Sequence, residues 1–161
     1  MTTLNHLLQQ ARSAGVERLD AQLLAAHALQ CSRSWVIAHA DEVLNAEQAA
    51  AINPLLQRRA AGEPLAYIVG ERECAGLRLR VTPDVLIPRP DTETLVDWAL
   101  ELLHDVPRPW VADLGTGSGA IALAVQHRRA DAQVHASDVS AAALDVARAN
   151  GERLGLAVHW H

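Results

Sequence analysis

Chemistry-bearing residues are most concentrated in a short glycine-rich stretch, Asp113-Leu114-Gly115-Thr116-Gly117-Ser118-Gly119. Its first two residues end a strand-forming segment at 111–114, and a helix-forming segment at 120–127 follows it. Glycines at such a turn let the backbone approach a ligand closely, and the following helix starts with amides that lack intrahelical partners. Asp138 follows the next apolar segment, where a carboxylate accepts hydrogen bonds from ribose hydroxyls in dinucleotide folds. The loop and Asp138 are therefore candidate cofactor-binding residues.

The pattern alone leaves several interpretations of this loop open. A dinucleotide fold favours G-x-G-x-x-G, but here the third glycine comes one residue early. A P-loop needs Lys followed by Ser or Thr after its last glycine, whereas Ala120-Ile121 follow here. A purely structural turn is the third alternative. Asp113 favours S-adenosylmethionine, because a carboxylate at this point would attract an ammonium and a sulfonium and repel a pyrophosphate.

Composition and charge limit the class of protein. Half of the 161 residues are hydrophobic, a fifth are charged, and the formal net charge is −5, as expected of a soluble globular protein. No basic run exceeds Arg58–Arg59 or Arg128–Arg129, so we expect no direct nucleic-acid binding. We expect neither a secretory signal nor a membrane span.

The cysteines and histidines predict no metal site. Cys31 and Cys74 lie far apart and lack metal-ligand spacing, which favours a reducing, cytoplasmic location. His159 and His161 would share one face of a strand, but no third ligand is evident.

The first seventy residues predict helices. Thr3 is a candidate N-cap for the first of them, and Asn45 with Gln48 forms a capping-box pattern for the fourth. Pro54 predicts a break or kink in that fourth helix.

After Gly70 the periodicity changes. Leu77, Leu79 and Val81 alternate with arginines and predict a strand, and Val85–Ile87 would return as its partner after a turn at 82–84. Asp91 is then expected to cap a helix running to about residue 103. The inward positions of that helix would be Leu95, Ala99, Leu102 and Leu103, and we expect Trp35, Trp98 and Trp110 to be packing residues.

From Trp110 the pattern becomes α/β. Two strand–helix units, with Ser140 as N-cap of the second helix, precede a third strand at 157–160. Two such units cannot cover both faces of a parallel sheet, so the pattern predicts an incomplete, truncated domain.

Two further strings carry a resemblance to a known family. Gly62-Glu63-Pro64-Leu65-Ala66-Tyr67-Ile68-Val69-Gly70 is one, and Leu86-Ile87-Pro88-Arg89-Pro90-Asp91-Thr92-Glu93 is the other. With the glycine-rich loop, they resemble the protein-(glutamine-N5) methyltransferases of peptide chain release factors, the HemK/PrmC family. The resemblance covers the chain in order. It implies an α + α/β architecture with a helical docking domain at 1–72, a β-hairpin linker at 73–90 and an incomplete Rossmann-like methyltransferase domain at 91–161.

The resemblance also implies an activity: transfer of a methyl group from S-adenosyl-L-methionine to the Gln side-chain amide of the Gly-Gly-Gln motif in class 1 release factors. The cofactor-binding residues would be Asp113, Gly115, Thr116, Gly117, Ser118, Gly119 and Asp138, with Arg89, Pro90 and Thr92 nearby. The N-terminal helices and the hairpin would dock the release factor, and the protein would be a cytoplasmic monomer.

This sequence departs from the family pattern in two places. Cys74-Ala75 stand where the family has aromatic residues, and the family's catalytic Asn-Pro-Pro-Tyr string is absent. We therefore assign no catalytic residue and expect these 161 residues alone to be inactive. Two alternatives stay open: a methyltransferase acting on nucleic-acid amino groups, and a helical binding module without enzymatic activity.

Overall fold

The computed structural model describes residues 2–161, and the chain divides into two compact units, Met1–Val69 and Gly70–His161. The division falls between the last N-terminal helix and the first strand. The three-part division expected from the sequence, with boundaries at 72 and 90, stays a prediction. Among the described residues, no helix is long and apolar enough to cross a membrane.

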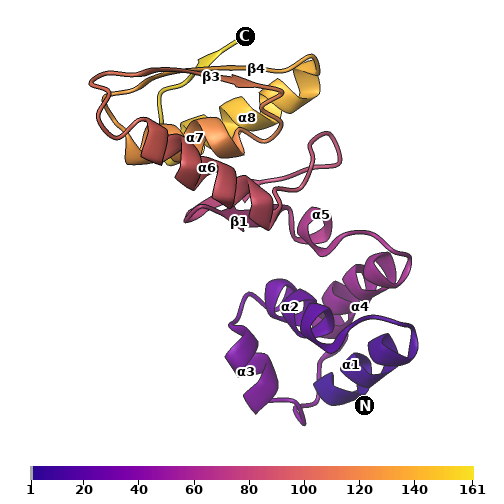
Figure 1. Cartoon of the computed structure of the whole chain (residues 1–161). Coiled ribbons are helices and arrows are strands. Elements are labelled where there is room, and N and C mark those ends of the chain that lie inside the picture. The colour runs from indigo at the N-terminus through magenta and orange to yellow at the C-terminus, as the bar shows by residue number, and fades with distance from the viewer. Residues whose placement is uncertain (1) are drawn as a thin grey trace. The chain divides into compact units, whose positions relative to one another are not determined.

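The first unit consists of helices (Figure 1). Their bounds are α1 Leu4–Ser13, α2 Arg18–Ala28, α3 Arg33–Ala38, α4 Ala46–Ala60 and α5 Leu65–Val69. The side chains of Leu4, Leu24, Val36 and Ile52 are fully buried and form the centre of the core. Helix α5 was not expected from the sequence, because five residues after Pro64 are too few to show a helical period.

The expected caps of this unit are confirmed. The Thr3 hydroxyl accepts a hydrogen bond from the His6 amide at 3.3 Å. The Asn45 and Gln48 side chains accept reciprocal bonds from each other's amides, at 2.8 and 3.0 Å. A break at Pro54 is ruled out, because α4 continues through it from Ala46 to Ala60, and a kink there stays a prediction. Packing of Ile52 and Leu56 into the core offsets the hydrogen bond that a proline removes.

The second unit is an α/β arrangement. Its elements are β1 Glu71–Cys74, β2 Leu77–Arg80, α6 Pro90–Leu102, β3 Trp110–Leu114, α7 Ala120–Arg128, β4 Gln133–Ser137, α8 Ala141–Leu154 and β5 His159–Trp160. Strands β3, β4 and β5 form a parallel sheet in that order, with Leu114 opposite Ser137 at the end of the first pair. This confirms the expected Rossmann-like organisation.

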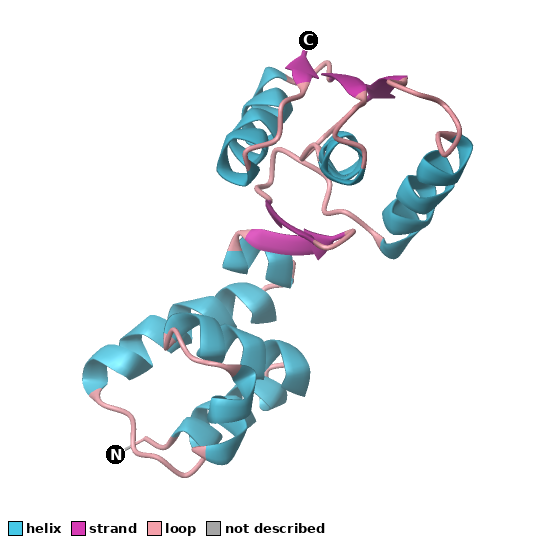
Figure 2. Ribbon diagram, turned by 90° about the vertical axis from the view of Figure 1, so that its left-hand side faces the viewer, coloured by secondary structure: helices cyan, strands magenta, loops and turns pink. Residues whose placement is uncertain are grey.

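The helices of this unit lie on one face of the parallel sheet. Both views show α6, α7 and α8 between the sheet and the β1–β2 hairpin (Figures 1 and 2). Leu79, Val96 and Leu123 are fully buried between the hairpin and the helices. Val125 of α7 and Val134 of β4 are buried in a second cluster between the helices and the sheet. On the other face, Trp110 is 72% exposed.

The expected hairpin partner was wrong. Strand β2 pairs antiparallel with Glu71–Cys74, and Val85–Ile87 forms no strand. The two strands are joined by Ala75 and Gly76, whose φ angles of 51° and 81° fit a type I′ turn. The charged run Glu71-Arg72-Glu73 lacks the alternation that marks a strand in sequence, and the prolines flanking 85–87 disfavour pairing there.

Helix α6 begins earlier and faces differently from the expectation. Its N-cap is Arg89 rather than Asp91, because Pro90 suits the first helical position. Val96 is the buried residue of α6, whereas Leu95 and Leu102 are 45% and 64% exposed. The expected packing role of Trp98 is also wrong, since its side chain is largely exposed. Trp110 is largely exposed too, but its ring stacks on that of His135.

Candidate cofactor-binding site

The glycine-rich loop lies where two parallel strands end. It follows β3 and leads into α7, and Asp138 directly follows β4. The amides of Gly115 and Thr116 each donate to the Ser137 carbonyl at 2.9 Å, which ties the loop to the end of β4. The crevice outside the carboxyl ends of such strands is where open α/β sheets bind ligands. The sequence thus predicted correctly that the loop and Asp138 come together.

Asp138 is in direct contact with the loop. One carboxylate oxygen accepts from the Gly117 amide at 2.9 Å, and the other accepts from the Ser140 amide at 3.0 Å. Bonds from the Ser140, Gly117 and Val139 amides hold the pKa of Asp138 below the ordinary aspartate value. Asp138 is therefore ionised at neutral pH. Each of its oxygens retains acceptor capacity, as hydrogen bonds from a pair of ribose hydroxyls would require.

Asp113 has a different environment. Its side chain is buried, and its Oδ2 accepts from the Thr116 hydroxyl at 2.7 Å and from the Ala122 amide at 3.2 Å. Ala122 lies in the first turn of α7, whose amides have no intrahelical partners. The carboxylate is thus engaged inside the unit and holds the loop against the helix start. This geometry favours positioning of the loop over the direct attraction of a sulfonium.

The loop glycines divide into open and crowded positions. A Cβ placed on Gly115 or Gly117 would meet no atom within 4 Å, so this side of the loop is free for a ligand. A Cβ on Gly119 would lie 3.0 Å from Leu123 Cδ1 and 3.2 Å from Trp160 Cη2. Gly119 therefore permits packing inside the unit, and Gly115 and Gly117 permit close approach from outside.

The remaining predicted contact residues are less accessible or more remote in sequence. Thr116 and Ser118 are buried, so a cofactor would meet their backbone before their side chains. Arg89 and Thr92 lie at the start of α6, where the Thr92 hydroxyl accepts from the Arg89 amide at 3.2 Å. Contact of Arg89 and Thr92 with a cofactor stays a prediction.

Asn150, on α8, was missed by sequence reasoning. Its side chain is fully buried and donates to the Ser118 carbonyl of the loop at 2.9 Å. Helical spacing could have identified it. Asn150 follows Ala147 by three residues, and Ala147 follows Ala143 by four, so all three lie on the buried face of the helix. A polar residue on such a face needs a polar partner.

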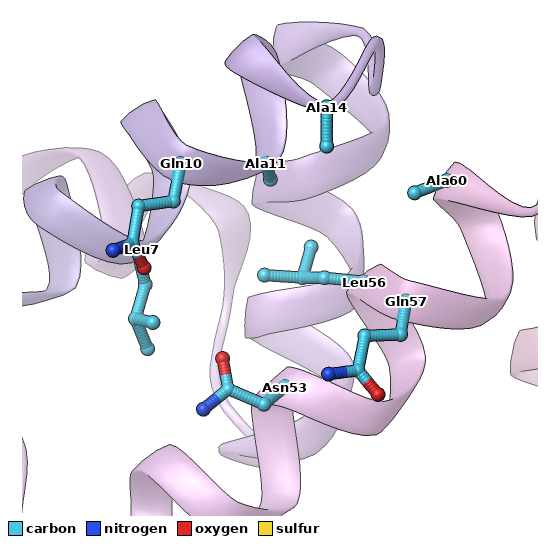
Figure 3. Close-up of a pocket in the computed structure, with 8 residues that line it drawn as sticks. All are labelled: Leu7, Gln10, Ala11, Ala14, Asn53, Leu56, Gln57 and Ala60. Carbon is cyan, nitrogen blue, oxygen red and sulfur yellow. The ribbon is translucent and has the colours of Figure 1, made fainter.

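A separate groove lies in the first unit, between α1 and α4 (Figure 3). Its volume is about 190 Å³. Its lining is aliphatic with a few amide side chains: Leu7, Gln10, Ala11, Ala14, Asn53, Leu56, Gln57 and Ala60. None of these side chains titrates or acts as a nucleophile. The groove therefore offers no acid–base chemistry, and the loop of the second unit is the stronger candidate site.

Comparisons with known proteins match both units. Residues 2–70 match the family model described as PrmC N-terminal domain, and residues 94–161 match the one described as methyltransferase small domain. The fold and the loop thus define a helical unit followed by a Rossmann-like methyltransferase unit. Both matches agree with the resemblance to the HemK/PrmC family, the release factor glutamine methyltransferases.

Curated relatives carry the same family name. The release factor glutamine methyltransferase of Burkholderia pseudomallei is 52% identical over 143 residues, which are 89% of this chain and 50% of the relative. That of Bordetella pertussis is 50% identical over 158 residues, 98% of this chain and 57% of the relative. That of Xylella fastidiosa strain 9a5c is 47% identical over 91% of this chain and 53% of the relative. The chain spans about half the length of the curated relatives it matches.

Proposed function

We propose that this chain is the docking and cofactor-binding part of an S-adenosylmethionine-dependent methyltransferase. The acceptor is the Gln side chain of the Gly-Gly-Gln motif in class 1 peptide chain release factors. The observation that carries the proposal is the contact between the ionised Asp138 and the glycine-rich loop, within a chain about half identical to proteins of that name. The chain acts as a cytoplasmic monomer, and nucleic acid is not its substrate.

The residues present fit this cofactor. Gly115 and Gly117 leave open space at the loop, and Asp138 supplies an anionic acceptor for the ribose diol. Asp113 and Thr116 hold the loop in shape from beneath. S-adenosylmethionine, when bound, supplies a methyl group on a positively charged sulfur. This chain binds the nucleoside, orients it and keeps the loop rigid.

The acceptor amide places a demand on the rest of the site. An amide nitrogen is a poor nucleophile because its lone pair is delocalised, so it must be aligned with the methyl–sulfur bond. Orientation of this kind contributes up to about 7–11 kcal/mol in favourable systems. In the family that this chain resembles, the Asn-Pro-Pro-Tyr motif provides the alignment. The 161 residues contain no such string, so we assign alignment of the acceptor to groups outside them.

Cofactor binding is tested by titrating the chain with S-adenosylhomocysteine in a calorimeter. We expect one site per chain. Asp138→Ala should weaken binding about tenfold or more, because it removes a charged acceptor from the ribose hydroxyls. The control is Asp145→Ala, which removes an exposed carboxylate on α8. A chain that binds no cofactor, or an Asp138→Ala variant that binds as tightly as the parent, would contradict the proposal.

Methyl transfer is tested with a chimera. Residues 1–161 are joined to the part of the Bordetella pertussis relative that lies outside the match, and the product is incubated with a class 1 release factor and S-adenosylmethionine. Mass spectrometry should find one added methyl group on the Gln of Gly-Gly-Gln. Replacing that Gln by Asn in the release factor is the control. A folded chimera that binds cofactor but methylates a nucleic acid instead would favour the alternative methyltransferase.

A further inference from the structure

Asn150 makes a fully satisfied set of hydrogen bonds to two distant parts of the second unit. Its Oδ1 accepts from the Arg80 amide at 2.7 Å, and its Nδ2 donates to the Arg80 carbonyl at 3.0 Å. The same Nδ2 donates its second hydrogen to the Ser118 carbonyl at 2.9 Å. Arg80 is the last residue of β2, and Ser118 belongs to the glycine-rich loop. One buried side chain thus connects the hairpin to the candidate cofactor site.

The bonds to Arg80 imitate a strand pair. A carboxamide carries the same donor and acceptor as a peptide group, and Asn150 uses both on one residue of β2. Burying such a group costs free energy unless all its bonds are made, whereas a complete set makes the surroundings rigid. The Asn150 side chain is fully buried and both amide hydrogens are used. These hydrogen bonds therefore fix the position and orientation of the Asn150 side chain.

The bond to Ser118 acts on the shape of the loop. Holding the Ser118 carbonyl fixes the plane of the peptide between Ser118 and Gly119. Gly119 has a φ of 82°, and its amide donates to the Thr116 carbonyl at 2.9 Å. Rotation of that peptide would break both bonds and disturb the turn that presents Gly117. The orientation of the loop thus depends on a side chain that lies on another helix.

We propose that Asn150 is a positioning residue for cofactor binding, which couples strand β2 of the hairpin to the glycine-rich loop. This inference rests on the proposed function, because it concerns how that site is held. The coupling has two consequences. Binding of the cofactor at the loop restrains the backbone of β2. Loss of the Asn150 amide weakens cofactor binding, although it removes no group that touches the cofactor.

The test compares Asn150 with a neighbour that binds the hairpin and Asn150 but not the loop. Asn150→Asp keeps the size and an acceptor but loses both hydrogens, and Asn150→Leu keeps the size alone. Arg153 on the same helix donates to the Arg78 carbonyl of β2 and touches Asn150, with no bond to the loop. Arg153→Ala is therefore the matched control for a merely structural loss.

Affinity for S-adenosylhomocysteine is measured by calorimetry, well below each variant's melting temperature. Both Asn150 variants should raise Kd about tenfold, as expected when a buried carbonyl loses its donor, and Arg153→Ala should stay within about twofold. Equal affinity of Asn150→Asp and the parent, or an equal loss in Arg153→Ala, would overturn the inference.

Amide hydrogen exchange provides a second measurement that needs no variant. Addition of S-adenosylhomocysteine to the parent chain should slow exchange of the Arg80 amide, which the loop reaches through Asn150. Unchanged exchange at Arg80 in a chain that binds the cofactor would count against the coupling.

If the parent chain binds no cofactor, the proposed function fails separately. The positioning role of Asn150 is then tested by hydrogen exchange of the Gly119 amide. This amide should exchange faster in Asn150→Asp than in Arg153→Ala, and equal rates in the two variants would refute the positioning role.

Discussion

At the scale of single residues, Asp113 is a buried carboxylate that holds the glycine-rich loop in place by hydrogen bonds. It accepts hydrogen bonds from the Thr116 hydroxyl and the Ala122 amide while its side chain is buried. Replacing it with alanine leaves both donors without their acceptor. We expect Asp113→Ala to lower the free energy of unfolding by about 1–3 kcal/mol. Urea denaturation measures this, with the exposed Asp145→Ala as control, expected to stay within about 0.5 kcal/mol. Similar losses in the two variants would contradict the role of Asp113.

Gly117 and Gly119 allow a second prediction at this scale, because both have positive φ but different surroundings. Alanine at Gly117 enters open space and bears mainly the cost of a left-handed backbone, about 1–2 kcal/mol. Alanine at Gly119 bears that cost and also a clash with Leu123 and Trp160, together about 2–5 kcal/mol. Urea denaturation should therefore rank Gly119→Ala as the less stable variant. Cofactor titration should rank the folded Gly117→Ala variant as the weaker binder. A reversed order in either measurement would contradict the packing role of Gly119 or the ligand-facing role of Gly117.

At the scale of elements, predictability followed the strength of local patterns. The succession β3, loop, α7, β4 and α8 was predicted nearly to the residue, because apolar strands, glycines and the Ser140 cap all indicate the same structure. Strand β1 was missed, since its Glu-Arg-Glu run shows no apolar face and is held by pairing with β2. The role of Asn150 could not be predicted either. Its partners lie 70 and 32 residues away, and only the tertiary fold brings them together.

The β1–β2 turn allows a prediction at the scale of elements. Ala75 occupies a left-handed position, with φ of 51°, in a two-residue turn that favours glycine or asparagine. Ala75→Gly should relieve backbone strain of about 1–2 kcal/mol and lose part of this through one buried methyl group. We expect the free energy of unfolding to stay constant or to rise by up to about 1 kcal/mol. In contrast, Ala142→Gly on the exposed face of α8 should lower it by about 1 kcal/mol. Thermal and urea denaturation compare the two, and a marked loss in Ala75→Gly would show that the turn is not strained.

At the scale of the whole molecule, the parallel sheet differs between its two faces. The helices α6, α7 and α8 cover one face, and an array of stacked rings lies on the other. His135 stacks on Trp110 with ring centroids 4.9 Å apart, and on His159 with centroids 4.6 Å apart. One ring nitrogen of His135 lies 3.0 Å from a ring nitrogen of His161. Rings from β3, β4 and β5, together with that of His161, thus form one cluster, and a proton on His135 would lie against the neighbouring imidazoles.

This cluster makes stability depend on pH. Partial removal from water, and then the neighbouring His159 and His161, lower the pKa of His135 below the ordinary histidine value. The unfolded chain therefore binds a proton on this residue more readily than the folded chain does. The contribution to stability is complete above about pH 6.5 and is lost as the pH falls from there through the folded-state pKa. We expect the Tm to fall between pH of about 7.5 and 5.5, as measured by circular dichroism. His135→Phe keeps a ring for stacking and should flatten this dependence, whereas an unchanged pH profile in that variant would assign the effect to other groups.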